Sequence, residues 1–295
     1  MYDSIIIGGG PAGLSAAIYL RRALKKVLII EEKVYGGAIV EALMVTNYPG
    51  IKAISGPKFA KDLYDQAIAF GSEYINEHVE EIINTQNYKE VRTDKNTYKA
   101  KTVIIASGEK NRKTGLPNED NLIGKGISYC ATCDGHFFKG KEVAVYGGGN
   151  SAIGSVLYLA GICSKVYLIN RRDVLRADKY LQDKLKAKDN IVYVLNKTVK
   201  AINGTDKLES VTLSDDTTLN ISALFVQIGQ VPNTDFVKNL IRLDDRGYVI
   251  SDDCKTNVDG IYVAGDVRTK DLRQLITASS DGAVSATLAI DYLEK

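Results

Sequence analysis

Residues 5–31 read IIIGGGPAGLSAAIYLRRALKKVLIIE, and this stretch decides the fold. The apolar run at 5–7 predicts a buried strand, the periodicity of 12–24 predicts a helix, and the run at 27–30 predicts a second strand. The glycines between the first strand and the helix match the pattern G-x-G-x-x-G. A glycine loop in this position is typical of a βαβ unit that binds a dinucleotide.

The residues of this glycine loop predict contact with a pyrophosphate. Glycines permit the tight turn and the close backbone approach, and the start of the helix offers free N–H groups. Glu31 ends the second strand, where a carboxylate accepts hydrogen bonds from ribose hydroxyls and repels a 2′-phosphate. The sequence therefore predicts an unphosphorylated adenosine diphosphate moiety, as in FAD or NAD, with a purely structural turn as the alternative. The loop residues are Gly8, Gly10, Pro11, Ala12 and Gly13.

A second glycine loop follows the same plan. A strand at 142–146, a helix at 150–160 and a strand at 165–169 surround it. After its second strand, this unit carries arginines at the place where the first unit has Glu31. Arginine binds phosphate with two parallel hydrogen bonds. This favours NADPH over NADH, and a solvated basic surface is the alternative. The residues concerned are Gly147, Gly149, Asn150, Ser151 and Ala152 in the loop, and Arg171, Arg172 and Arg176 after it.

Composition indicates a globular chain. Of its 295 residues, 45% are hydrophobic and 25% are charged, and the net charge is only +2. This balance gives no reason to expect nucleic acid or an anionic membrane as a partner. The sequence shows no signal peptide and no apolar run of about 18 residues. A cytoplasmic location is the resulting expectation.

The order of the segments predicts two α/β domains. A strand at 103–108 precedes the second βαβ unit, and residues 256–266 and 274–293 resemble a strand and helix that return to the first domain. We therefore expect two Rossmann-like three-layer dinucleotide-binding domains, the second inserted into the first. The expected boundaries are 1–114 with 243–295 for the first domain, which would bind FAD, and 115–242 for the second, which would bind NADPH.

The stretch SYCATCDGHFFKG at 128–140 contains Cys130 and Cys133. Structural zinc needs four ligands, but the chain has only two histidines and no second C-x-x-C, so no metal site is expected. A structural disulfide is disfavoured because its loop is short and the expected compartment is reducing. Thiol–disulfide exchange therefore fits best. Cys163 and Cys254 are isolated and are interpreted as ordinary small side chains.

Taken together, these motifs identify a known family. The chain resembles the low-molecular-weight thioredoxin reductases, which are class II pyridine nucleotide-disulfide oxidoreductases with FAD and NADPH. The motifs fall in the family's order and cover nearly the whole chain. They are GGGPAG, NYPG at 47–50, CATCDG, GGGNSA, NRRxxxR and YVAGDV.

The resemblance implies roles for individual residues. Cys133 would face the flavin, and Cys130 would attack the substrate disulfide. Asp134 would be the acid that protonates a leaving thiolate or reduced flavin, with an acid that caps the turn before Gly135 as the alternative. The start of the last helix would lie near the flavin ring, where its dipole stabilises negative charge. FAD positions of the family correspond to Glu31, Gly37, Asn47, Val79, Asp266, Arg273 and Gln274. NADPH positions correspond to Ser151, Arg171, Arg172 and Arg176.

The resemblance also implies a homodimer and thioredoxin, or a thioredoxin-like protein, as partner. One domain would rotate on the other about hinges near Thr114–Leu116 and Ile241–Asp244. The chain departs from the family pattern at Ala38, at Gly154-Ser155 where acids are common, and at Lys125 and His136. Asn170 replaces the usual histidine before the arginines.

The predicted function is transfer of electrons from NADPH through FAD and the Cys130–Cys133 pair to thioredoxin. Three alternatives stay open. One is reduction of a glutaredoxin-like carrier, and a second is ferredoxin or another donor in place of NADPH, which Gly154-Ser155 favours and the arginines oppose. The third is a flavin-bound redox sensor that does not turn over.

Overall fold

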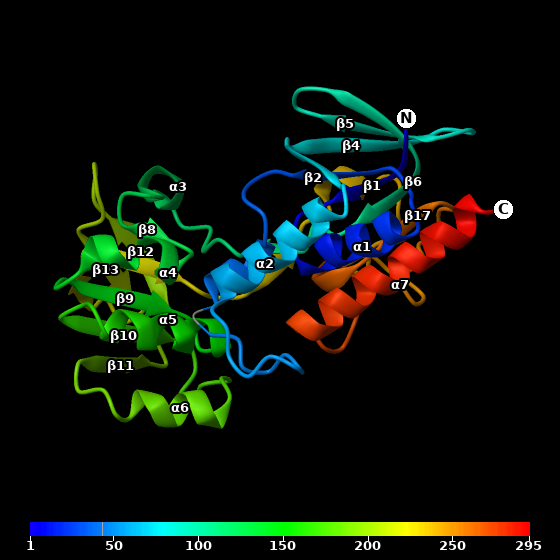
Figure 1. Cartoon of the computed structure of the whole chain (residues 1–295). Coiled ribbons are helices and arrows are strands. Elements are labelled where there is room, and N and C mark those ends of the chain that lie inside the picture. Colours follow the sequence, from blue (N-terminus) through cyan, green and yellow to red (C-terminus); the bar gives the residue numbers. More distant parts are fainter. Residues whose placement is uncertain (43) are drawn as a thin grey trace. The chain divides into compact units, whose positions relative to one another are not determined.

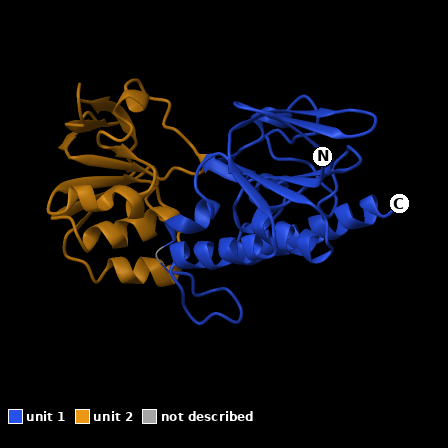
Figure 2. Cartoon of the chain, turned by 45° about the horizontal axis from the view of Figure 1, so that its top comes forward, with its two compact units in different colours: residues 1–110, 231–295 blue, residues 111–230 orange. Residues whose placement is uncertain are grey.

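The chain folds as two units, and the second is inserted into the first (Figure 2). The computed structural model describes residues 1–42 and 44–295. Unit 1 comprises residues 1–110 and 231–295, and unit 2 comprises residues 111–230. The discontinuity of unit 1 confirms the predicted insertion of one domain into the other.

Unit 1 is built on a seven-stranded sheet (Figure 1). β1 pairs in parallel with β2 on one side and with β6 on the other. The nine-residue β6 also pairs in parallel with β17 and antiparallel with β5, using its two ends for the two neighbours. The strands are β1 (Tyr2–Ile7), β2 (Val27–Glu31), β3 (Glu73–Asn76), β4 (Val79–Asn84), β5 (Lys89–Thr93), β6 (Thr97–Ile105) and β17 (Ile261–Val263).

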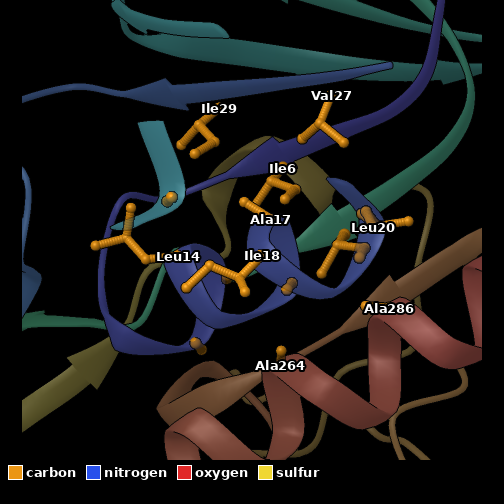
Figure 3. Close-up of a cluster of buried hydrophobic side chains, with 14 of the residues drawn as sticks. Ile6, Leu14, Ala17, Ile18, Leu20, Val27, Ile29, Ala264 and Ala286 are labelled. Carbon is orange, nitrogen blue, oxygen red and sulfur yellow. The ribbon is translucent and has the colours of Figure 1, made fainter. Parts of the chain in front are cut away.

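Two helices pack against each other beside this sheet. Leu14 and Ile18 of α1 lie in one buried cluster with Ile6 of β1 and Ala286 of α7 (Figure 3). A Cβ added at Gly282 of α7 would lie only 2.2 Å from the Ala12 carbonyl oxygen, so glycine is required for this close approach. The helices of unit 1 are α1 (Pro11–Arg22), α2 (Gly56–Ala69) and α7 (Leu275–Leu293), with short 3₁₀ turns η1 (Gly37–Glu41), η3 (Asp235–Val237) and η4 (Gly265–Val267).

Unit 2 repeats the design around a five-stranded parallel sheet of order β11-β10-β9-β15-β8. Side chains alternate along a strand, so Val143 and Val145 of β9 join one buried cluster and Ala144 joins another. The first cluster includes α5, and the second includes a small antiparallel sheet, which gives three layers.

The elements of unit 2 have the following bounds. The parallel strands are β8 (Ile127–Ser128), β9 (Glu142–Tyr146), β10 (Lys165–Asn170), β11 (Ile191–Leu195) and β15 (Ala223–Val226), and the antiparallel strands are β12 (Val199–Asn203), β13 (Ser210–Leu213) and β14 (Thr218–Asn220). The helices are α3 (Glu119–Leu122), α4 (Ala131–Asp134), α5 (Asn150–Ala160) and α6 (Lys179–Leu185), with the 3₁₀ turn η2 (Gly135–Phe138). The chain passes between the units within β7 (Glu109–Asn111) and β16 (Gln230–Pro232).

The α/β fold and both βαβ units are confirmed. The predicted helix at 12–24 corresponds to α1, which ends at Arg22 because Leu24 adopts a left-handed backbone with φ of 59°. The predicted strand at 103–108 is the end of β6, which stops at Ile105 before the turn at Gly108. None of the helices formed by residues 1–42 and 44–295 is long and apolar enough to cross a membrane.

The compact units divide at 110/111 and 230/231, four and twelve residues before the predicted domain boundaries at 114/115 and 242/243 (114 − 110 and 242 − 230). Val237 and Ile241 are buried in the same cluster as Ile5 of β1, so this segment belongs to unit 1. Thr114 and Gly115 donate backbone hydrogen bonds to the carboxylate of Glu119, and therefore belong to unit 2.

The two predicted hinges lie inside the units rather than at their divisions. Thr114–Leu116 lies within unit 2 and Ile241–Asp244 lies within unit 1, four and eleven residues from the two divisions respectively (114 − 110 and 241 − 230). Rotation of one unit on the other, and the segments about which it would occur, stay predictions.

Candidate nucleotide-binding and disulfide sites

The first glycine loop has the close backbone packing that its sequence predicts. A Cβ at Gly8, whose φ is +110°, would lie 2.2 Å from the Ala106 carbonyl oxygen. A Cβ at Gly13 would lie 2.0 Å from the Gly8 carbonyl oxygen. Gly10 caps α1, and Pro11 and Ala12 form its first turn. The loop therefore leaves the first N–H groups of α1 available to a pyrophosphate.

Glu31 lies beside this loop, where the sequence predicts a ribose contact. Its Oε2 accepts a hydrogen bond from the Gly9 amide at 2.7 Å, and its Oε1 accepts one from the Lys33 amide at 2.9 Å. Each carboxylate oxygen has a second lone pair for a ligand hydroxyl. Glu31 also lines a pocket at the carboxyl ends of β1 and β2, together with Ile7, Gly8, Ile30, Glu32, Glu77, His78, Val79, Ser107, Asn233 and Phe236.

This pocket brings in residues that sequence reasoning missed. Glu77 and His78 follow β3, and Asn233 comes from a segment expected in the other domain. The signal that could have located Glu77 and His78 is their position after a parallel strand, because ligands of open α/β sheets bind outside the carboxyl ends of the strands. Val79, one of the predicted FAD residues, is buried in the pocket wall.

Other predicted FAD residues meet in pairs. A Cβ at Gly37 would lie 3.2 Å from the Gly10 Cα, so Gly37 borders the glycine loop. The Asn47 amide nitrogen donates to the Gln274 side-chain oxygen at 3.0 Å, which joins the NYPG segment to the start of α7. Gln274 is the N-cap of α7.

Arg273, which the resemblance assigns to FAD, binds the backbone of the turn before it, and its contact with FAD stays a prediction. Its guanidinium donates to the backbone carbonyl oxygens of Asp266, Arg268 and Lys270 at 3.1–3.2 Å. It also lies 4.1 Å above the centre of the Tyr248 ring. These contacts hold the turn around η4 in shape, so in this structure Arg273 supports the turn that carries Asp266.

Asp266 provides the test of whether the site fits a flavin nucleotide. Its Oδ1 is buried and has no hydrogen-bond partner among the described residues. Burial raises the pKa of Asp266 to about 6, and the negative charge of Glu109 adds to the shift. A buried acceptor without a donor is costly. The hydroxyl groups of a ribityl chain are donors of the kind this oxygen lacks, so the residues fit FAD.

A buried charge cluster that the sequence did not predict lies beside Asp266. Asp281 of α7 is 6% exposed, and its Oδ2 accepts from the Gly265 amide at 3.0 Å. Arg268 binds both oxygens of this carboxylate at 2.7–2.8 Å, and the Lys270 ammonium lies 2.8 Å from Oδ2. Burial alone would raise the pKa of Asp281, but the hydrogen bonds from Arg268 and Lys270 outweigh it and lower that pKa.

Replacing Asp281 with asparagine is expected to destabilise the protein by about 3–5 kcal/mol, because the largely buried cations Arg268 and Lys270 lose their charged partner. Urea unfolding at neutral pH measures this loss. The exposed ion pair between Lys110 and Asp235 provides the control, and Asp235→Asn should cost less than about 1 kcal/mol. A loss for Asp281→Asn no larger than that of the control would contradict the interpretation.

The lowered pKa of Asp281 also gives the sign of a pH effect. A carboxyl group whose pKa is lower in the folded state stabilises the fold at neutral pH, and this contribution disappears as the pH falls below its ordinary value of about 4. The difference in unfolding free energy between the parent protein and Asp281→Asn should therefore shrink as the pH falls below that value.

The second glycine loop is as closely packed as the first. A Cβ at Gly147, whose φ is +152°, would lie 2.1 Å from the Gln227 carbonyl oxygen. Gly149 caps α5, whose first residues are Asn150, Ser151 and the buried Ala152. The Asn150 side chain exchanges two hydrogen bonds with Asp178, at 3.0 and 2.8 Å, and so ties the loop to the segment before α6.

The three predicted phosphate-binding arginines lie in the segment between β10 and α6. Arg171, Arg172 and Arg176 are all exposed. Within residues 1–42 and 44–295, none of their guanidinium groups forms an ion pair or a side-chain hydrogen bond. Their charges are therefore available to an anionic ligand.

Cys130 and Cys133 form a disulfide with a Cα–Cα distance of 5.3 Å. Cys130 is the N-cap of α4 and is half-buried, whereas Cys133 is exposed. The Cys133 amide donates to the Cys130 sulfur at 3.2 Å, and the Thr132 hydroxyl lies 3.4 Å from the same sulfur. After reduction, these donors would stabilise a thiolate on Cys130, because hydrogen bonds to the charged form favour it.

Asp134 is fixed next to this disulfide by a buried serine. The Ser128 hydroxyl donates to Asp134 Oδ2 at 2.6 Å and accepts from the Cys130 amide at 3.1 Å. The Asp134 amide in turn donates to the Cys130 carbonyl oxygen at 3.2 Å. The predicted acid and the predicted exchange cysteine thus belong to one hydrogen-bonded loop.

Aromatic side chains are exposed next to this loop. Phe137 is 67% exposed, and the His136 ring lies against it at an angle of 39°, with ring centres 3.9 Å apart. Cys163 and Cys254 are free and buried, as expected of ordinary small side chains, and burial raises the pKa of Cys163 to about 11. The part of the chain that the structure describes contains no cluster of three or more metal-ligating side chains.

Comparison with known proteins assigns the chain to a class. The pyridine nucleotide-disulphide oxidoreductase family matches residues 2–282, and the chain belongs to this family. It is 41% identical to the thioredoxin reductase of Bacillus subtilis, over 100% of this chain and 96% of that protein. It is 43% identical to the thioredoxin reductase of Mycoplasma genitalium, over 98% and 94% of the two chains.

Solved structures agree with this assignment. The crystal structure of Lactococcus lactis thioredoxin reductase superposes with a TM-score of 0.94 at 36% identity, covering 100% of this chain and 99% of that one. The resemblance to thioredoxin reductases that the motifs indicate is therefore confirmed over the whole chain, and so is the fold.

Proposed function

We propose that this protein is a flavoenzyme that reduces the disulfide of thioredoxin with electrons from NADPH. FAD would be held in unit 1, and NADPH and the Cys130–Cys133 disulfide would belong to unit 2. The observation that carries the proposal is a C-x-x-C disulfide in the same unit as a glycine loop, which is followed by arginines whose side chains form no ion pair with the residues that the structure describes. The family assignment and the full-length similarity to thioredoxin reductases support it.

FAD, when bound, supplies two-electron transfer between the nicotinamide and the disulfide. Glu31 would accept hydrogen bonds from the hydroxyls of the adenosine ribose of FAD, and Asp266 would accept one from a hydroxyl of its ribityl chain. The first N–H groups of α1 would receive the pyrophosphate, with Gly37 and Asn47 beside it. Arg171, Arg172 and Arg176 would bind the 2′-phosphate of NADPH, with its pyrophosphate at Gly149–Ser151.

Reduction of the disulfide would then prepare the exchange reaction. Two electrons and a proton convert the S–S bond into a Cys133 thiol and a Cys130 thiolate, which the Cys133 amide stabilises. The Cys130 sulfur attacks the disulfide of thioredoxin, and Asp134 in its protonated form would give a proton to the thioredoxin sulfur that leaves. The Cys133 sulfur then attacks the Cys130 sulfur and restores the Cys130–Cys133 disulfide, while the second thioredoxin sulfur leaves and takes up the proton that Cys133 loses.

The proposed donor is tested with the purified FAD-loaded protein under anaerobic conditions. NADPH should bleach the flavin absorbance and, when oxidised thioredoxin is added, reduce it catalytically, whereas NADH should do so much less efficiently. Reduced ferredoxin and a glutaredoxin-like carrier serve as the competing donor and acceptor. Bleaching by reduced ferredoxin but not by NADPH would reject the proposed donor, and bleaching without turnover would favour the redox sensor.

The implied homodimer and the implied rotation of one unit on the other stay predictions. The mass of the protein in solution, measured by light scattering, tests the first. A dimer should give twice the chain mass of 32.2 kDa.

A further inference from the structure

Asn170 occupies the position in unit 2 that Glu31 occupies in unit 1. In unit 1, the Gly8 amide donates to the Ile30 carbonyl oxygen at 2.8 Å, and Glu31 is the next residue. In unit 2, the Gly147 amide donates to the Ile169 carbonyl oxygen at 2.9 Å, and Asn170 is the next residue. Both residues are therefore the last of the second strand of a βαβ unit, where the ribose of a bound dinucleotide is recognised.

The side chains of Glu31 and Asn170 differ in charge and in whether they accept or donate hydrogen bonds. The Glu31 carboxylate accepts hydrogen bonds from two backbone amides, Gly9 and Lys33. The Asn170 amide nitrogen instead donates to the carbonyl oxygens of Arg172 and Val174, each at 3.0 Å. Asn170 is 7% exposed, so its neutral amide group forms these hydrogen bonds away from solvent.

Asn170 also joins the arginine segment to the glycine loop. A Cβ at Gly148 would lie 2.6 Å from the Asn170 Oδ1, so the amide rests directly on the glycine backbone. The Arg176 amide donates to the Gly148 carbonyl oxygen at 2.8 Å. The backbone of residues 171–176 is therefore held against the loop on both sides, while the three guanidinium groups have no partner among the described residues.

We propose that Asn170 determines the selectivity of the second nucleotide site for a 2′-phosphate, by two effects of one side chain. Its amide holds the arginine segment in place, which reduces the cost of ordering that segment when a ligand binds. Its neutrality also leaves the ribose-recognition position without the carboxylate that would repel a phosphate. Asn170 is in this sense a positioning residue, and the inference rests on the proposed use of NADPH.

The test measures binding of NADP⁺ and NAD⁺ to the FAD-loaded protein by calorimetry. Asn170→Ala removes the two hydrogen bonds without adding charge, and NADP⁺ affinity should fall about five- to tenfold while NAD⁺ affinity is unchanged. Asn170→Asp keeps the size, loses the donor and adds a negative charge. It should lower the ratio of NADP⁺ to NAD⁺ affinity further, by about fiftyfold or more.

Asn190 offers a matched control. Its amide nitrogen also donates to two backbone carbonyl oxygens of unit 2, those of Ala160 and Cys163, at 3.0 and 3.1 Å. Asn190→Ala should lower the melting temperature by an amount similar to Asn170→Ala and leave the NADP⁺ to NAD⁺ ratio unchanged. The comparison separates selectivity from loss of stability.

Three outcomes would overturn the inference. If both Asn170 variants keep the parent ratio, Asn170 does not determine selectivity, although the proposed function stands. If Asn170→Ala loses NADP⁺ and NAD⁺ affinity equally, its role is only structural. If the parent protein itself binds NADP⁺ no better than NAD⁺, the proposed donor fails together with the inference.

Discussion

Replacing Cys130 with serine is expected to abolish reduction of thioredoxin, lowering the rate by at least about a thousandfold, because the exchange reaction loses its nucleophile. Bleaching of the flavin by NADPH should persist, since that step precedes the disulfide. Cys133→Ser should also abolish turnover, but it leaves Cys130 able to form a mixed disulfide with thioredoxin that cannot be resolved. Stopped-flow absorbance and non-reducing gels distinguish the two variants.

Cys163→Ser is the control for this pair. Cys163 is buried, its sulfur donates to the Phe138 carbonyl oxygen, and its pKa is raised to about 11 by burial. A thiol in this state is a poor nucleophile, so the variant should retain nearly the parent activity. Turnover by Cys130→Ser, or a stable mixed disulfide in Cys130→Ser but not in Cys133→Ser, would reverse the assignment of the two roles.

The double variant Arg171→Ala, Arg172→Ala is expected to reduce the preference for NADPH over NADH by about a hundredfold. Each charge-assisted hydrogen bond to a phosphate contributes about 1.5–3 kcal/mol, and exposure to solvent places both arginines toward the lower end. The loss should appear mainly in the KM for NADPH, with little change in kcat, because the 2′-phosphate is remote from the reacting ring.

A charge-matched control distinguishes direct contact from the general field of the protein. Lys188 and Lys207 are exposed residues of unit 2 outside the arginine segment. Lys188→Ala with Lys207→Ala removes the same charge and should leave the NADPH preference intact. An unchanged preference in the arginine variant would mean that these side chains form only a solvated surface.

Much of the fold could be predicted because its signals are local. An apolar strand, a glycine turn and an amphipathic helix are each encoded within a few consecutive residues, and both βαβ units follow from them. The boundaries could not be placed in the same way. Val237 and Ile241 belong to unit 1 only because they are buried with Ile5, more than 200 residues earlier in the chain.

The predicted site residues divide along the same line. Glu31 and the three arginines follow strands that the sequence reveals. In the structure Glu31 binds the Gly9 amide, and the Arg176 amide binds the Gly148 carbonyl oxygen. Asp281 could not be found from its sequence neighbours, because its partners Gly265, Arg268 and Lys270 belong to a separate turn that meets α7 only in the folded chain.

The sequence by itself determined the class of chemistry: two dinucleotide folds and one cysteine pair, each written in a short motif whose geometry is fixed by the backbone. Only the tertiary structure decided which contacts surround the residues of these motifs. Among the described residues it leaves one oxygen of Asp266 without a hydrogen-bond donor, places two cations against Asp281, and turns Asn170 toward the arginine segment. These arrangements depend on contacts between distant or side-by-side segments, and burial and hydrogen-bond partners of that kind exist only once the chain has folded.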